Sequence, residues 1–204
     1  MFYNYKDFFS VILTAMADTN YRFVYVDISS YGKDCDSTIF ELSTLWTSIQ
    51  TNMLELPSER PLSGTEGPNV PYFFVGDKGS VLNRNILWPF GGCNLSVKKR
   101  VYNYHLCRAR RYVECAFGIL SNKWRIFQRP LNVSPDFAVD TVKACVVLHN
   151  FVRARDGYKF EDALTVTGLE DVPDGQAVGG VLTTNGVRNK VADYFLTDAG
   201  AASW

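Results

Sequence analysis

The chain has 204 residues, of which 47% are hydrophobic and 14% aromatic. This suits one domain, or one domain with a tail, and excludes a disordered or fibrous protein. The formal net charge is zero, but the charges are unevenly distributed. Residues 98–129 hold nine Lys or Arg and one acid, Glu114, for a local charge of +8 (9 − 1). This block suggests a surface that binds a polyanion, with a merely solvated helix face as the alternative.

The first part of the chain favours a β-hairpin followed by a helix. Phe8–Ala17 and Phe23–Ile28 are rich in β-branched and aromatic residues and flank a polar turn that starts at Asp18. From Asp36 to Ser48, apolar residues recur at helical spacing, and Asp36 would cap this helix or lie just inside it. Four prolines and two glycines in residues 57–71 predict a loop.

The middle of the chain predicts a short strand and a long helix. Tyr72–Val75 is a continuous apolar run, typical of a strand buried on both faces in a parallel sheet, and it ends at Gly76 and Asp77. Residues 89–94 indicate a loop. Residues 96–120 predict one helix, whose apolar stripe would consist of Leu106, Ala109, Val113, Phe117 and Leu120.

The last part predicts a second helix and a tail. Helical spacing extends from Asp136 to Ala154, and the glycine-rich segment after Gly157 indicates a loosely ordered tail with a short helix at residues 187–196. The order of elements predicts an α/β fold with a small mixed sheet, in a domain of residues 1–156 followed by a tail of residues 157–204. The sequence contains no run of roughly 20 apolar residues, so we expect no membrane span.

Acidic residues are the best candidates for chemistry. Asp18 and Asp77 follow predicted strands, Asp36 opens a helix, and Glu114 lies within the basic helix. Carboxylate oxygens are the ligands that Mg²⁺ prefers, and basic residues nearby would hold the phosphates of a nucleic acid. The five cysteines and two histidines show no spacing typical of a zinc site.

Each of these acids also has a purely structural interpretation. Asp18 and Asp77 lie in sequences typical of turns, and Asp36 suits a helix cap. Glu114 has Arg110 and Arg111 at i−4 and i−3, the spacing of a helical ion pair worth a few tenths of a kcal/mol. Spacing alone therefore does not identify an enzyme.

Five sequence blocks nevertheless occur in an order that resembles a known family. They are YNYKDFFSVILTAMAD (3–18), GKDCDSTIFELSTL (32–45), PYFFVGDKGSVL (71–82), YNYHLCRARRYVECAFGIL (102–120) and ACVVLHNFV (144–152). They resemble the DDE endonuclease domain of PIF/Harbinger-type transposases and their domesticated relatives. VRNKVADYF (187–195) adds a weaker resemblance.

The resemblance implies an RNase H-like fold with a mixed sheet flanked by helices, and cleavage and joining of DNA that depends on Mg²⁺ or Mn²⁺. It implies catalytic, metal-binding roles for Asp77 and Glu114, with Asp36 as an additional metal ligand. It also implies a nuclear location, with the cytoplasm as a second compartment. The residues expected to bind DNA are Lys98, Lys99, Arg100, Arg108, Arg110 and Arg111.

One part of the family pattern is missing from the sequence. The family's first catalytic aspartate, on the first strand, would lie upstream of Tyr3, so we expect the domain to lack its N-terminal part, including that strand. We do not assign this role to Asp18, which closes the second strand of the family order. A separate DNA-binding partner protein and an oligomer are left open. The alternative functions are a catalytically inactive remnant that binds DNA or protein, and an unrelated α/β protein.

Overall fold

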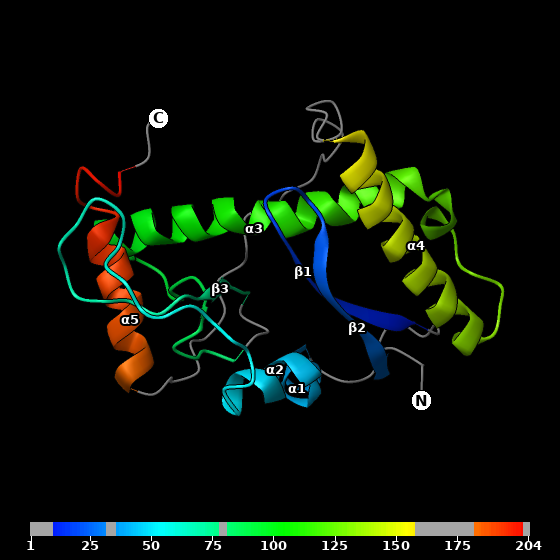
Figure 1. The fold of residues 1–204 in the computed structure, drawn as a ribbon, viewed down its shortest axis with the longest axis horizontal. Helices are drawn as coiled ribbons and strands as arrows, with labels where there is room; N and C mark the ends of the chain where they lie inside the picture. The colour runs from blue at the N-terminus through cyan, green and yellow to red at the C-terminus, as the bar shows by residue number, and fades with distance from the viewer. Residues whose placement is uncertain (1–9, 32–35, 78–80, 158–181, 202–204) are drawn as a thin grey trace. The chain divides into compact units, whose positions relative to one another are not determined.

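The computed structural model describes residues 10–31, 36–77, 81–157 and 182–201, whose helices and strands are drawn in Figure 1. The chain divides into two compact units. Unit 1 consists of Met1–Ile39 and Arg111–Asp171, and unit 2 consists of Phe40–Arg110 and Val172–Trp204. Both units combine helices with a pair of strands, which confirms the predicted α/β class. The boundaries 1–156 and 157–204 stay a prediction.

Unit 1 contains the predicted hairpin, in which β1 (Val11–Ala17) pairs antiparallel with β2 (Phe23–Tyr31). One carboxylate oxygen of Asp18 accepts backbone N–H groups of Asn20 at 2.8 Å and Arg22 at 2.9 Å, and the other pairs with the Arg22 guanidinium at 2.8 Å. Burial acts to raise the pKa of Asp18, but these hydrogen bonds and the charge of Arg22 lower it overall. Asp18 is therefore a turn residue, as its sequence context indicated.

The helix α4 (Pro135–Asp156) holds this hairpin through side chains that bind its backbone. His149 Nε2 lies 2.7 Å from the carbonyl oxygen of Tyr21, and because a carbonyl can only accept, this nitrogen carries the proton. Asn150 Oδ1 accepts the N–H of Phe23 at 2.9 Å, and its Nδ2 donates to the Phe23 carbonyl at 2.8 Å. Arg153 lies over the Tyr21 ring. The start of β2 is thus fixed to α4.

The predicted helix at residues 36–48 is wrong in one respect, because the structure has two helices there, α1 (Asp36–Leu42) and α2 (Thr44–Gln50). Ser43 separates them in an extended conformation. Its hydroxyl accepts the N–H of Trp46 at 3.1 Å and donates to the Phe40 carbonyl at 2.6 Å. This buried serine therefore bonds a carbonyl at the end of α1 and an N–H at the start of α2, which makes it the N-cap of a second helix. Periodicity alone predicted one continuous helix.

Unit 2 contains a parallel pair of very short strands, β3 (Phe74–Val75) and β4 (Ile86–Leu87). The parallel strand predicted at residues 72–75 is confirmed in type, but β3 is only half buried, whereas β4 is fully buried. The described strands form two separate two-stranded sheets. A single RNase H-like mixed sheet therefore stays a prediction.

The predicted long helix is confirmed as α3 (Val97–Lys123), and a 3₁₀ turn (Arg125–Gln128) follows it. The predicted apolar stripe is partly wrong, because Ala109 is exposed. The helix instead buries two separate sets of side chains. Tyr102 and Leu106 belong to the core of unit 2, and the core of unit 1 contains Ala116, Ile119 and Leu120.

The final helix, α5 (Leu182–Tyr194), confirms a helix near the predicted position and belongs to unit 2. Val191 and Ala192 are fully buried in the core of that unit. The Arg188 guanidinium lies 3.9 Å from the centre of the Phe90 ring and 5.4 Å from that of Trp88, and burial lowers its pKa. Residues 158–181 lie outside the described residues.

Replacing Asn150 by Ala tests the contact between α4 and β2. The variant leaves the N–H and carbonyl of Phe23 without these partners, so we expect a loss of about 2 kcal/mol in the free energy of unfolding and faster hydrogen exchange at the Phe23 amide. Urea unfolding and exchange measurements check this. Asn132→Ala, at an exposed position before α4, is the matched control, and an equal loss in both variants would contradict the prediction.

Candidate metal centre and nucleic-acid interface

Asp77 lies two residues after the end of β3 in unit 2, and its side chain is exposed. The N–H of Gly76 donates to the carbonyl of Leu87 at 2.9 Å. Hydrogen bonds to β4 therefore hold the backbone as far as Gly76, the residue before Asp77. In α/β proteins, ligands bind near the carboxyl ends of parallel strands. The position of Asp77 is therefore the one expected from the sequence, at the end of a parallel-paired strand.

Glu114 lies in the part of α3 that belongs to unit 1, and its side chain is half buried. Burial raises the pKa of the neighbouring Cys115 thiol, the charge of Glu114 raises it further, and Arg111 opposes both effects. The Glu114 carboxylate therefore acts electrostatically on a thiol next to it on the helix.

Aromatic contacts on both sides of Glu114 hold this stretch of α3 against the hairpin. The ring centres of Tyr112 and Tyr21 are 5.5 Å apart, and those of Phe117 and Phe23 are 5.3 Å apart. These contacts join α3 to Tyr21 in the turn and to Phe23 in β2. The helix α4 binds the backbone of the same two residues. The packing of unit 1 thereby fixes the helix position that carries Glu114.

The structure describes Asp77 and Glu114 within different units, and for Asp36, the first residue of α1, it describes only the backbone. In the described part of the chain, no group of three or more His, Cys, Asp or Glu side chains could hold a metal ion. The carboxylates have the donor chemistry that Mg²⁺ and Mn²⁺ prefer. The carboxylates therefore match Mg²⁺ and Mn²⁺ in donor type, although the described residues contain no cluster of three such ligands.

The predicted DNA-binding residues differ in how available their charges are. Lys98 is half buried and pairs with Asp193 of α5 at 2.5 Å. This ion pair therefore links α3 to α5 within unit 2. Lys99 is exposed and lies 5.2 Å from the centre of the Phe90 ring. Arg100, Arg108 and Arg111 are exposed, and Arg110 is half buried.

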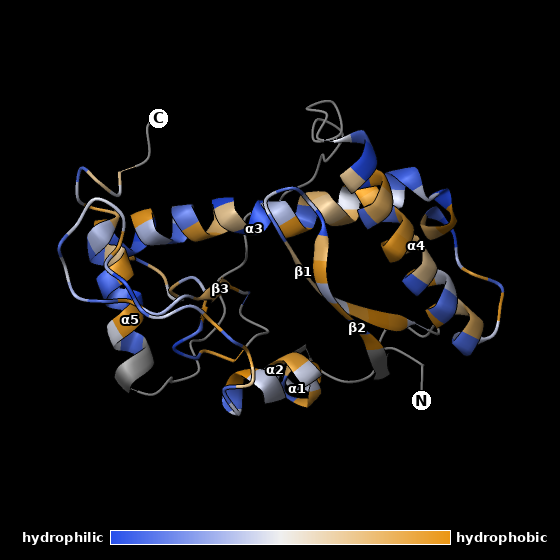
Figure 2. Ribbon diagram, in the orientation of Figure 1, coloured by the Kyte–Doolittle hydropathy of each residue, from blue (hydrophilic) through white to orange (hydrophobic). Residues whose placement is uncertain are grey.

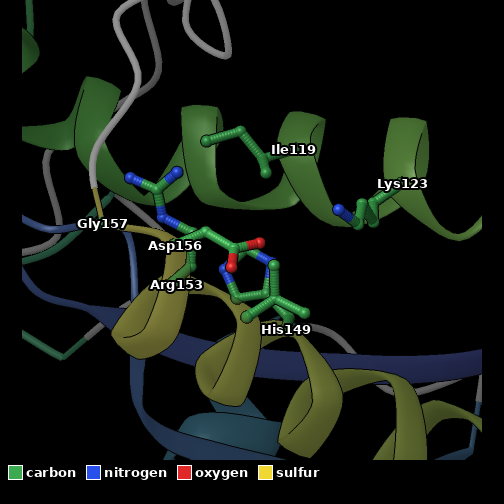
Figure 3. Close-up of a pocket in the computed structure, with 7 residues that line it drawn as sticks. Ile119, Lys123, His149, Arg153, Asp156 and Gly157 are labelled. Carbon is green, nitrogen blue, oxygen red and sulfur yellow. The ribbon is translucent and has the colours of Figure 1, made fainter.

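A pocket in unit 1 contains charged residues that the sequence did not single out. It has a volume of about 140 Å³ and lies between α3 and α4, with Lys123, His149, Arg153 and Asp156 among its lining residues, as Figure 3 shows. His149 is 2% exposed. Burial and the charge of Arg153 lower its pKa, although the hydrogen bond to the Tyr21 carbonyl acts in the opposite direction. Only the fold brings α3 and α4 together here, so no sequence motif could have revealed this pocket.

Comparison with protein families gave a match to the model of the DDE superfamily endonuclease, over residues 1–150. The chain belongs to this family. The matched region contains β1 to β4, all of α3 and most of α4, together with Asp36, Asp77 and Glu114. Comparisons with curated proteins and with solved structures gave no match.

Membership of the DDE superfamily endonucleases implies DNA as the substrate, and the family generally uses divalent metal ions. The family match confirms the DDE part of the resemblance. The PIF/Harbinger subtype and the expected loss of an N-terminal part stay predictions. No helix among the described residues is long and apolar enough to cross a membrane.

Folding stability of this DDE superfamily endonuclease should depend on pH through His149. Its pKa is lower in the folded than in the unfolded chain, so the unfolded chain binds more protons as the pH falls below about 6.5. Stability is therefore full above this pH and decreases below it. His149→Gln keeps a donor for the Tyr21 carbonyl and should flatten the decrease, as measured by urea unfolding between pH 5 and pH 8.

His105→Gln is the comparison for this experiment. Burial and the charge of Arg108 lower the pKa of His105 too, but its ring is less buried than that of His149, so the variant should flatten the curve less. Superimposable pH curves for the wild type and His149→Gln would show that His149 does not cause the dependence.

Proposed function

We propose that this protein is a transposase-type nuclease of the PIF/Harbinger kind, which cuts DNA and transfers strands with the help of Mg²⁺ or Mn²⁺. The observation that carries the proposal is the family match over residues 1–150, which includes both the strand end with Asp77 and the helix with Glu114. The five ordered sequence blocks support the subtype. A DNA substrate supports a location in the nucleus.

In this proposal, Asp77 and Glu114 are the metal ligands, and Asp36 is an additional ligand. All three offer carboxylate oxygens, and Asp77 is exposed while Glu114 is half exposed. Bound divalent ions would activate the attacking water or hydroxyl group and stabilise the leaving oxygen of the phosphodiester. Within its own unit, Asp77 follows the end of β3 in unit 2, and Glu114 lies on the packed part of α3 in unit 1.

The basic residues of α3 would hold the DNA backbone. Four of them, Lys99, Arg100, Arg108 and Arg111, are exposed and offer charges that phosphates can reach. Lys98 and Arg110 are half buried, and we expect a smaller contribution from Lys98 because Asp193 already offsets its charge. Contacts of this kind position the nucleic acid but do not read its sequence.

The metal proposal predicts that Asp77→Asn and Glu114→Gln each lower Mg²⁺-dependent nicking of plasmid DNA by about a hundredfold or more, because a catalytic metal stabilises the transition state by several kcal/mol. Calorimetric titration with Mn²⁺ should show weaker binding in both variants. Asp198→Asn and Glu66→Gln, at exposed positions, are the matched controls. Unchanged nicking in Asp77→Asn and Glu114→Gln would refute the assignment. DNA binding without nicking by the wild type would favour the non-catalytic alternative.

The DNA-binding proposal predicts that the double variant Arg108→Ala/Arg111→Ala binds all DNA sequences more weakly and with a smaller salt dependence, because two phosphate contacts are lost. Fluorescence anisotropy at several salt concentrations measures both quantities. The charge-matched control is Lys143→Ala/Lys190→Ala, whose residues are exposed and lie outside residues 98–129. Equal weakening by both double variants would show that net charge, and not this helix, determines binding.

A further inference from the structure

The helix α4 has a second apolar face, opposite to the one that holds the hairpin. Its inner face carries Cys145, Val146, His149 and Arg153, which are buried. Its outer face carries Phe137, Val147, Leu148 and Phe151, which are 61%, 68%, 44% and 58% exposed. Figure 2 shows hydrophobic residues along this helix. Exposed apolar residues are common when single, but a row of four on one helix indicates a binding surface.

The outer face is built from two parallel ridges of residues four apart. One ridge consists of Asp140, Ala144 and Leu148, and the other consists of Val147, Phe151 and Arg155, and all six side chains are exposed. Helices pack by placing such ridges into the grooves of a neighbouring helix. The first ridge has an acid at its N-terminal end and a small residue at its centre. The second has a large ring at its centre and a base at its C-terminal end.

These two ridges are complementary to each other in an antiparallel pair of identical helices. A two-fold axis that passes between Val147 and Leu148 relates the two copies. Each residue then faces the residue of the second copy that lies the same number of positions beyond the axis. Ala144 then meets Phe151 of the second copy, so a large side chain faces a small one. Val147 meets Leu148, which extends the apolar contact across the axis.

The charges fit the same arrangement. Asp140 would meet Arg155 of the second copy, at both ends of the contact. In the single chain, Asp140 lies 3.8 Å from Lys143, and Arg155 pairs with the adjacent Asp156 at 2.6 Å. Both ion pairs are on the exposed surface, so Asp140 and Arg155 can also interact with charges of a second copy. Antiparallel helices also align their dipoles favourably.

We propose that two copies of this chain associate through the outer faces of α4, antiparallel and about a two-fold axis between Val147 and Leu148. Self-complementarity is what a two-fold interface requires, and it identifies a second copy, instead of an unrelated partner, as the occupant. The exposed parts of Val147, Leu148 and Phe151 amount to roughly 300 Å² per copy, below the usual size of a stable interface. The dimer is therefore weak and depends on concentration.

Sedimentation equilibrium of the full chain, from about 1 to about 200 µM, tests the proposal. The wild type should pass from monomer to dimer over this range. Leu148→Glu places a charge in the contact and should weaken dimerisation by about a hundredfold or more without changing the circular dichroism spectrum, because Leu148 is not buried in the monomer. Met53→Glu, which changes an exposed apolar residue of unit 2, is the matched control and should dimerise like the wild type.

Charge reversal tests the orientation. Asp140→Arg and Arg155→Asp should each weaken the dimer by about tenfold, and the double variant should recover wild-type association. A wild type that stays monomeric at all concentrations would overturn the proposal, as would a dimer unaffected by Leu148→Glu. A double variant that associates no better than the single variants would overturn the antiparallel arrangement.

Discussion

The two hydrogen bonds between the Asn150 side chain and the backbone of Phe23 are the contact on which the packing of unit 1 depends. An isolated two-stranded hairpin is marginally stable in water, so β1 and β2 need a partner. Asn150 fixes their position along α4, and His149 binds the preceding turn at Tyr21. Once β2 is held there, the ring of Phe23 contacts Phe117 of α3. The position of Glu114, three residues earlier on that helix, follows from this packing.

Unit 2 uses the same device at a different place. Asn103 of α3 accepts the N–H of Phe90 at 2.7 Å and donates to its carbonyl at 2.9 Å. Phe90 follows β4 by three residues, so this contact holds the end of β4, and with it the paired strand β3, to α3. The strand end that carries Asp77 is thereby anchored within its unit by an amide side chain, not by a large sheet. In both units, one helical asparagine satisfies the backbone N–H and carbonyl of a phenylalanine that begins a strand or follows one.

Periodicity and turn chemistry predicted the elements that are long or strongly patterned, namely the hairpin, α3 and α4. They did not predict the break at Ser43, because a hydroxyl that caps one helix and ends another leaves the apolar spacing unchanged. β4 has two residues, too few to show any period. In the candidate site, the strand end at Asp77 could be predicted from sequence. The pairing of Lys98 with Asp193 could not, because it joins segments 95 positions apart (193 − 98) that only tertiary packing brings together.

The contacts of α4 with the hairpin also decide which of its residues are left on the surface. His149 and Asn150 bind the backbone of the turn and of β2, so the orientation of the helix about its own axis is fixed by hydrogen bonds and not only by apolar packing. A rotation that turned Val147 and Phe151 inward would also turn Cys145 and Val146 out of the core. The polar contacts prevent this rotation, since turning the helix would leave buried donors and acceptors without partners. The apolar outer face therefore follows from the same residues that hold unit 1 together, and among the described residues of that unit Val147 and Phe151 stay exposed.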